Sequence, residues 1–408
     1  MNVHAPMSGI DRRTFLKWTA GGLAALAAVR WQDASADEGR RDLIAVSSAG
    51  DKQAGVAPSI SLIDPDSYDV LATLPLAGHF SFPATRWDPA RDLIWSGVPG
   101  GDHQAVMAFR LSTGEHALDI PTGSSQNYTE LTPDGSEVIA AARFQDRYLR
   151  IGADPAADSF GKVLATLDTY KGANPCDITV SADGRYAYAP DRGGDTVTTI
   201  DLEDFSIAST VPLEQLTPGP LQPYMCTVSP TGRVLLVENA IVKDASQTGS
   251  ESILDLSAPD KPVEVARLSV DDGLGRGPMT SEFTADGRYG IVICRDSSEL
   301  SIINTGSHKV VGNVSFPDGS NPLTGTFAYA DHGDTFFVPL PGRDAVAAVK
   351  TPAFEVDRLI PVGPRPMGVV FLEAAVPDRS VSEVPMGAAL ASGRTFPAGC
   401  PDRCCGPV

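Results

Sequence analysis

The feature that most constrains this chain is a repeat of roughly 40 to 55 residues. Residues 174–213 and 277–316 share one pattern, and residues 222–237 match its first half. Each copy opens with an X-Pro pair, turns at Asp-Gly-Arg or Thr-Gly-Arg, and continues through further short apolar runs. Such self-similarity indicates that one structural unit is stacked several times.

The short runs within each copy are typical of antiparallel β-strands. β-Branched and aromatic residues alternate along them, and Asp183-Gly184 and Asp286-Gly287 supply the positive φ that hairpin turns need. Four such strands form one twisted sheet, and a single sheet cannot bury both of its faces. Radial stacking of the sheets solves this problem, so the sequence predicts an all-β propeller of four-stranded antiparallel blades.

Counting the copies predicts seven blades. Six are complete, at residues 82–120, 126–169, 175–213, 223–270, 278–316 and 322–361. Residues 42–76 supply three strands without an inner one, and residues 366–372 supply an inner strand with nothing after it. We therefore expect the N- and C-terminal strands to share the seventh blade and close the ring.

The run "ADGRYAYAPDRGGDTVTTIDLEDFSIASTVPL", residues 182–213, resembles the repeat of the YVTN/YncE-like β-propeller family. The resemblance covers nearly all of residues 42–372 and implies the seven-bladed fold. It says little about function, because propellers host many activities. The architecture is also similar to the large subunit of periplasmic quinone-cofactor amine dehydrogenases, in which the propeller is a platform for a small catalytic chain.

The start of the chain resembles a twin-arginine (Tat) signal peptide. It has the pair Arg12-Arg13, an apolar run at residues 18–29 and small residues before Ala36. The run is shorter than the roughly 20 residues that span a bilayer, so we expect cleavage after Ala36 and a periplasmic protein; an uncleaved anchor is the alternative. The expected parts are the signal (1–36), the propeller (37–372) and a Pro/Gly/Ser-rich tail (373–408).

The chain is acidic, with a formal net charge of −19 at pH 7. Nucleic-acid binding depends on Lys and Arg contacts to phosphate, so a nucleic-acid partner is excluded. No segment after the signal is apolar for long enough to suggest a stable membrane span.

Arginines are predicted to gather at one mouth of the central channel, where the inner strands begin. A guanidinium cluster suits a small anionic ligand or an acidic partner chain. The alternative is that neighbouring aspartates pair with these arginines on a solvated rim. The predicted ligand-binding residues of the mouth are Arg143, Arg192, Arg295, Arg343, Arg365, Tyr224 and Asn127.

Sulfur-containing side chains form a second predicted group at the same mouth. Thiol and thioether donors favour Cu(I), so copper is the predicted cofactor if a metal is bound. Alternatively, Cys and Met pack the channel wall as adaptable apolar residues. The predicted metal ligands are Cys176, Met279, Met367, His79, Cys400, Cys404 and Cys405.

The ending "CPDRCCGPV" follows the closed propeller and belongs to no repeat. In an oxidising compartment it is interpreted as a disulfide-pinned end, a metal or redox handle, or a docking tail. Cys294 falls within a predicted second strand, where packing is its expected role.

The chain contains no G-x-S-x-G elbow, no H-E-x-x-H pair and no dinucleotide fingerprint. We therefore expect an exported ligand-binding or platform subunit, working with a small periplasmic protein subunit in an amine dehydrogenase-like redox system or with a small anionic ligand. A copper redox protein and a lactonase-like hydrolase are the alternatives, and whether the protein is an enzyme stays open.

Overall fold

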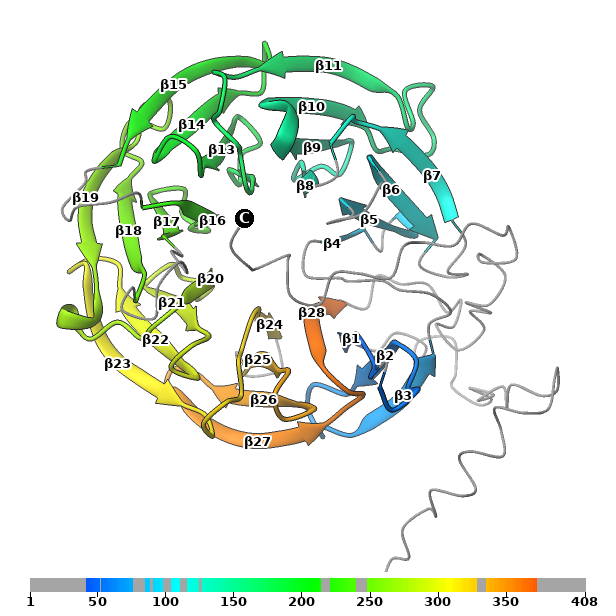
Figure 1. Ribbon diagram of the computed structural model, residues 1–408, viewed down its shortest axis with the longest axis vertical. Coiled ribbons are helices and arrows are strands. Elements are labelled where there is room, and N and C mark those ends of the chain that lie inside the picture. The colour runs from blue at the N-terminus through cyan, green and yellow to red at the C-terminus, as the bar shows by residue number, and fades with distance from the viewer. Residues whose placement is uncertain are drawn as a thin grey trace, which may run out of the picture.

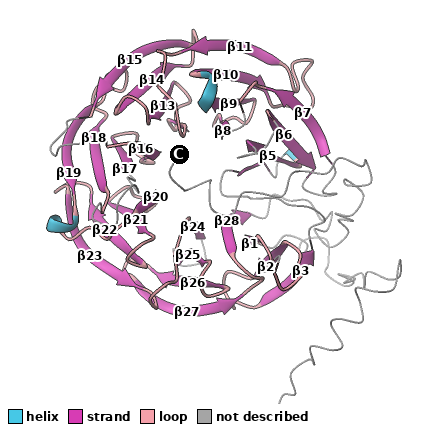
Figure 2. Cartoon of the chain, in the orientation of Figure 1, coloured by secondary structure: helices cyan, strands magenta, loops and turns pink. Residues whose placement is uncertain are grey.

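The computed structural model describes residues 42–372 apart from residues 52, 76–84, 89–90, 98–103, 111–115, 125–126, 214–220, 240–247 and 329–334. The described residues form seven four-stranded antiparallel sheets around a central axis (Figure 1). Strands dominate throughout (Figure 2), and helical structure is confined to short 3₁₀ turns such as η3 (Val270–Asp272). The predicted seven-bladed propeller is confirmed. No helix in the described part is long and apolar enough to cross a membrane.

The blades are numbered from the one that holds the first described strand, and their strands are given from the axis outwards. Blade 1 consists of β28 (Pro366–Leu372), β1 (Leu43–Ser48), β2 (Ser59–Ile63) and β3 (Val70–Pro75). Blade 2 consists of β4 (Thr85–Asp88), β5 (Leu93–Gly97), β6 (Ala105–Arg110) and β7 (His116–Pro121). Blade 3 consists of β8 (Asn127–Leu131), β9 (Glu137–Ala142), β10 (Arg147–Gly152) and β11 (Val163–Asp168).

The other four blades follow the same order. Blade 4 consists of β12 (Thr179–Val180), β13 (Tyr186–Asp191), β14 (Thr196–Asp201) and β15 (Ser206–Pro212). Blade 5 consists of β16 (Pro223–Val228), β17 (Val234–Asn239), β18 (Ser250–Asp255) and β19 (Val263–Leu268). Blade 6 consists of β20 (Pro278–Phe283), β21 (Tyr289–Cys294), β22 (Glu299–Asn304) and β23 (Lys309–Ser315). Blade 7 consists of β24 (Thr326–Ala328), β25 (Thr335–Leu340), β26 (Ala345–Lys350) and β27 (Glu355–Pro361).

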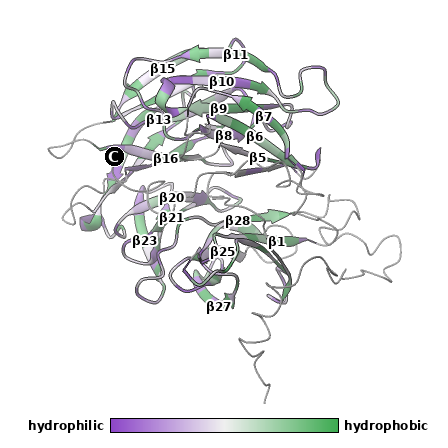
Figure 3. Cartoon of the chain, turned by 45° about the vertical axis from the view of Figure 1, so that its right-hand side comes forward, coloured by the Kyte–Doolittle hydropathy of each residue, from purple (hydrophilic) through white to green (hydrophobic). Residues whose placement is uncertain are grey.

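Blade 1 joins two ends of the described chain. Strand β28 pairs antiparallel with β1, so that Leu43 lies opposite Leu372 and Val46 lies opposite Val369. Both strands are largely hydrophobic (Figure 3), which suits a position between two neighbouring blades. The predicted shared blade is thus confirmed, and the ring closes through backbone hydrogen bonds between strands far apart in sequence.

The Asp-Gly turns connect the first and second strands as the sequence predicts. In blade 4, Gly184 has a φ of +71° and its N–H donates to the Ser181 carbonyl at 2.8 Å. The Asp183 carboxylate accepts the Ser181 hydroxyl at 2.6 Å and the Arg185 N–H at 3.0 Å. Glycine is required because an L side chain is strained at this φ.

The hydrophobic core is divided into layers between blades. Between blades 5 and 6, Leu236 and Ile253 pack against Phe283 and Val292. Comparable layers lie between blades 2 and 3, 3 and 4, 4 and 5, 6 and 7, and 7 and 1. Because each sheet buries both faces, the propeller needs neighbours on both sides of every blade.

A recurrent contact, here called the rim clasp, fastens the loop between the second and third strands to the connection that leads to the next blade. Asp146, which has a left-handed φ of 49°, accepts the N–H groups of Gly172 and Asn174 at 2.7 and 2.8 Å. A single bond of this kind recurs in blades 4 and 7, where Asp195 accepts from Gln222 and Asp344 accepts from Arg365. Each clasp positions the residue or residues just before an inner strand.

We predict that Asp146→Ala lowers the free energy of unfolding by about 1 to 3 kcal/mol, because it leaves two backbone donors without their carboxylate. Urea unfolding of the purified protein measures the effect. Asp168→Ala is the matched control, since the Asp168 carboxylate pairs with Arg147 but is 68% exposed, and such pairs contribute little. Equal losses in the two variants would contradict the role of the clasp.

Candidate functional site

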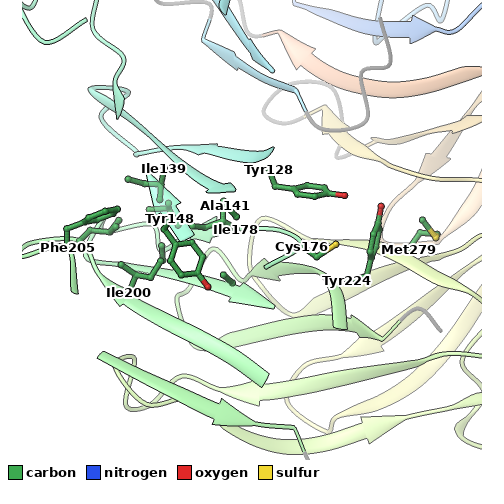
Figure 4. Packing of buried hydrophobic residues seen from close by; sticks show 14 of the residues in the cluster. Tyr128, Ile139, Ala141, Tyr148, Cys176, Ile178, Ile200, Phe205, Tyr224 and Met279 are labelled. Atoms are coloured by element: carbon green, nitrogen blue, oxygen red, sulfur yellow. The ribbon is translucent and has the colours of Figure 1, made fainter. Parts of the chain in front are cut away.

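The inner strands begin at one mouth of the channel, and the residues that follow their prolines form a single buried layer. This mouth layer contains Cys176, Tyr224 and Met279, together with Tyr128, which follows Asn127 instead of a proline (Figure 4). Leu323 belongs to the same cluster. Met225 and Met367 pack against it and are partly buried. The structure therefore brings together four of the predicted mouth residues, namely Cys176, Tyr224, Met279 and Met367.

Asn127 occupies a different position from the other predicted mouth residues. Strands β16 and β20 carry a β-bulge after their leading proline, whereas β8 pairs with β9 in continuous register from Asn127. Asn127 therefore pairs where Pro223 pairs in blade 5, and its side-chain amide donates to the Ala105 and Ser124 carbonyls at 3.1 and 2.9 Å. Tyr128 enters the mouth layer instead. A bulge leaves no plain signal in sequence, so the register of this copy was not predictable.

The sulfur atoms of the mouth layer sit in apolar surroundings. Burial raises the pKa of the Cys176 thiol, although the guanidinium groups of Arg143 and Arg192 and a hydrogen bond with Tyr128 oppose this shift. In the view of Figure 4 the ring of Tyr224 lies between Cys176 and Met279. This arrangement is what adaptable packing requires, whereas shared metal ligation requires the sulfur atoms to converge.

Four of the seven predicted metal ligands lie outside the described residues: His79, Cys400, Cys404 and Cys405. Within the described ranges, no group of three or more His, Cys, Asp or Glu side chains is arranged to hold a metal ion. Cys176, Cys226 and Cys294 are buried free thiols. Cys294 lies on β21 and joins the layer between blades 5 and 6, as its predicted packing role requires.

Three of the predicted rim arginines connect neighbouring blades. The Arg143 Nε donates to Asn174 Oδ1 at 2.7 Å, and Arg192 donates to Gln222 Oε1 at 3.1 Å. Arg343 donates to the Asp318 carbonyl. Asn174 and Gln222 belong to the connections that lead to the next blade, whereas Asp318 belongs to the connection from blade 6 to the inner strand of blade 7, the blade that carries Arg343. Each of the three guanidinium groups therefore contacts a connection between two blades.

The other two rim arginines behave differently. Arg295 forms an ion pair with the adjacent Asp296 at 2.8 Å, as the alternative of a paired rim predicts. Arg365 has a φ of 54° and is held through its backbone N–H by Asp344. The arginines thus have structural partners, and the binding of an anion by them stays a prediction.

A second layer, here called the carboxylate layer, lies further along the inner strands. Arg86 on β4 forms an ion pair with Glu130 on β8 at 2.7 Å, and it also interacts electrostatically with Asp177 and Glu282. Although these strands are the innermost of their blades, the side chains of Arg86 and Glu130 remain 31% and 23% exposed. Arg86 and Glu130 are thus partly exposed, whereas Asp177 is buried.

Charge in the carboxylate layer is unbalanced, since one guanidinium faces three carboxyl groups. Burial raises the pKa of Asp177 to about 7, against the influence of Arg86 and of N–H donors from Cys226 and Ile178. Burial likewise raises the pKa of Glu282 to about 8, although Arg86 opposes the shift. Carboxyl groups that titrate near neutrality beside an arginine are typical of binding and catalytic sites.

Sequence reasoning missed this layer, although a signal was present. Charged residues are rarely buried without a partner, yet each of four predicted inner strands carries one. The stretches concerned are "TRWD" (85–88), "YTEL" (128–131), "CDIT" (176–179) and "TSEF" (280–283). The site was predicted at the mouth instead, among the residues that follow the leading prolines.

Comparison of the sequence with family models and with curated proteins gave no match. Among solved structures, a protein from Lactobacillus plantarum has a TM-score of 0.63 at 14% identity, covering 82% of this chain and 100% of its own. The Pseudomonas aeruginosa periplasmic gluconolactonase PpgL has a TM-score of 0.61 at 17% identity, covering 82% of this chain and 99% of its own. Kuenenia stuttgartiensis hydrazine synthase has a TM-score of 0.54 at 15% identity, covering 73% and 97%. At these identities the similarity shows the fold alone.

We predict that stability falls as pH rises from about 5 to about 9. The folded-state pKa values of Asp177 and Glu282 lie above those of the unfolded chain, so the folded protein binds more protons in this range. For Asp177 alone the linked loss reaches about 4 kcal/mol. Below about pH 4 stability falls again, because hydrogen bonds lower the pKa of turn carboxyls such as Asp183 and Asp286.

Urea unfolding at several pH values tests this bell-shaped profile. The double variant Asp177→Asn/Glu282→Gln should make the alkaline side less steep and leave the acid side unchanged; some slope remains because burial also raises the pKa of Glu238 to about 7. An alkaline side that is as steep in the variant as in the native protein would show that other groups cause the loss.

Proposed function

We propose that the protein is an exported, ligand-binding propeller whose central channel holds a small organic dication, such as a diamine. The excess of carboxyl groups at the axis carries this proposal. With Glu130, Asp177 and Glu282 ionised, the layer carries a charge of about −2 after Arg86 is counted, and a diamine would balance it.

The mouth layer supports the same ligand class. Tyr128 offers an aromatic ring, which attracts ammonium groups, and Met279 and Met367 offer adaptable apolar walls for a hydrocarbon linker. The Tyr224 ring already lies beneath the Arg192 guanidinium, whose Cζ is 5.7 Å from the ring centroid. Ligand sites are commonly concave, mostly apolar and equipped with a few convergent polar groups. The two layers together meet this description.

Isothermal titration with putrescine at pH 7.5 tests the proposal, with 1,4-butanediol as the uncharged control. We expect putrescine to bind and 1,4-butanediol not to bind. Glu282→Gln should weaken the binding of putrescine at least about tenfold, because one charge-assisted contact is lost. Binding should release protons, since a nearby cation lowers the raised pKa values of Asp177 and Glu282. Equal heats for the diamine and the diol, or no binding of either, would contradict the proposal.

A lactonase-like hydrolase is the second candidate. Asp177 favours this candidate. Its carboxyl group has a pKa of about 7 and interacts electrostatically with Arg86, and such a group suits general-base catalysis. The PpgL fold is similar, and that protein is described as a gluconolactonase. Turnover of gluconolactone that falls about 100-fold or more in Asp177→Asn, with folding retained, would favour this candidate over ligand binding alone.

We further propose export by the twin-arginine route, because Arg12-Arg13 and the short apolar run after it resemble such a signal. The expected outcome is that the native protein appears in the periplasmic fraction, shortened at Ala36, and that Arg12→Lys/Arg13→Lys keeps it in the cytoplasm. Arg40→Lys/Arg41→Lys is the matched control and should be exported normally. Co-purification from the periplasm would also reveal a small protein subunit, for which the ring would serve as a platform.

A further inference from the structure

Two glutamates in the middle of the protein have no partners for their charge. Glu238 on β17 and Glu251 on β18 lie directly opposite each other in the sheet of blade 5. Both are fully buried, and all four of their carboxylate oxygens lack hydrogen-bond partners in the structure. Like charges directly opposite on neighbouring strands repel each other, and burial makes the repulsion stronger.

Strand alternation shows which way these side chains point. Leu236 and Ile253, two residues away from Glu238 and Glu251 on the same strands, pack against blade 6 in the layer that contains Cys294. Residues two apart share one face of a sheet, so both carboxylates also face blade 6. Ser281 on β20 of blade 6 acts on Glu238, and its hydroxyl is buried and has no hydrogen bond of acceptable geometry.

The surroundings supply no positive charge. Burial raises the pKa of Glu238 to about 7, with Asp177 adding to the rise and Ser281 opposing it. Burial and the neighbouring Glu238 raise the pKa of Glu251 well above its usual range. Glu251 in turn helps to raise the pKa of Cys294, and Glu238 helps to raise that of Glu282. Among the described residues, the groups that act on the two glutamates are carboxylates, a hydroxyl and the backbone N–H of Glu238 itself.

Some positive species must therefore sit between blades 5 and 6, and two kinds are available. A proton shared by the pair would satisfy two of the four carboxylate oxygens, and the Ser281 hydroxyl could donate to a third, on Glu238. A hard metal ion could instead be bound by oxygens of both glutamates and by the Ser281 hydroxyl, and it would cancel both negative charges. Calcium accepts carboxylates in one- or two-oxygen contacts together with other oxygen donors, in flexible geometry.

We propose that Glu238, Glu251 and Ser281 form a calcium site between blades 5 and 6, separate from the central channel. The ion neutralises the glutamate pair and ties the two blades together. With two acidic ligands, its affinity belongs to the range of extracellular calcium modules, with a dissociation constant of about 10⁻⁴ to 10⁻³ M. The site has fewer than three acidic groups, which agrees with the lack of larger metal-binding groups in the described part of the chain.

The experiment uses the purified full-length protein at pH 7.5. Equilibrium dialysis against 2 mM CaCl₂, with elemental analysis of the protein and buffer compartments, is combined with melting curves in calcium and in EDTA. We expect about 0.7 to 0.95 calcium per chain, and a melting temperature about 1 to 3 °C higher in 2 mM calcium than in EDTA. The same elemental analysis would reveal copper at the mouth layer.

Three variants make the assignment specific. Glu251→Gln should lose bound calcium and the calcium-dependent shift in melting temperature. Glu355→Gln, at an exposed position on β27, and Glu282→Gln, in the carboxylate layer, should keep both. If Glu251→Gln fails to fold, the calcium content and the EDTA effect of the native protein decide the matter.

Two results would overturn the proposal. One is a native protein that binds no calcium and whose melting temperature does not respond to EDTA. The other is calcium that is lost in Glu282→Gln and kept in Glu251→Gln, which would place the ion in the channel.

Discussion

Every blade of this protein has two apolar faces, and the rest of the structure depends on covering both. Leu236 and Ile253 are buried only because blade 6 lies against them, and the same holds for the layers between the other blades. A linear stack would leave two faces bare at its ends, whereas a ring leaves none. The rim clasps and bridging arginines then set the angle at which each blade follows the last.

Much of this architecture could be predicted from the sequence because its signals are local and repeated. The Asp-Gly turns, as at Gly184 and Gly287, require positive φ values, and the structure has them. The leading prolines mark where inner strands begin, and the missing inner strand of residues 42–76 predicts the pairing of β28 with β1. In each case one residue type suits one backbone conformation, so the pattern has few alternative interpretations.

The sites were harder to predict because they depend on register and depth. One bulge decides whether Asn127 or Tyr128 reaches the mouth layer, and no residue type marks it. Glu130, Asp177 and Glu282 come from three different blades, and each interacts with Arg86. They lie far apart in the sequence, so no local pattern shows that they share a layer. Arg143 and Arg192 donate to the connections that lead to the next blade, and the binding of an anion by the arginine cluster stays a prediction.

The pairing of β1 with β28 also determines when the ring can exist during folding. The other six blades are built from consecutive strands among the described residues, and each can form as soon as its own segment is available. Leu43 and Leu372 must instead find each other across almost the whole domain, which is a slow, long-range contact with a large loop-closure entropy. Until these strands pair, the ring is open and exposes an apolar sheet face at each of its two ends. Strand β28 is the last strand of the propeller to be synthesised, so the ring cannot close before nearly the whole domain has been made.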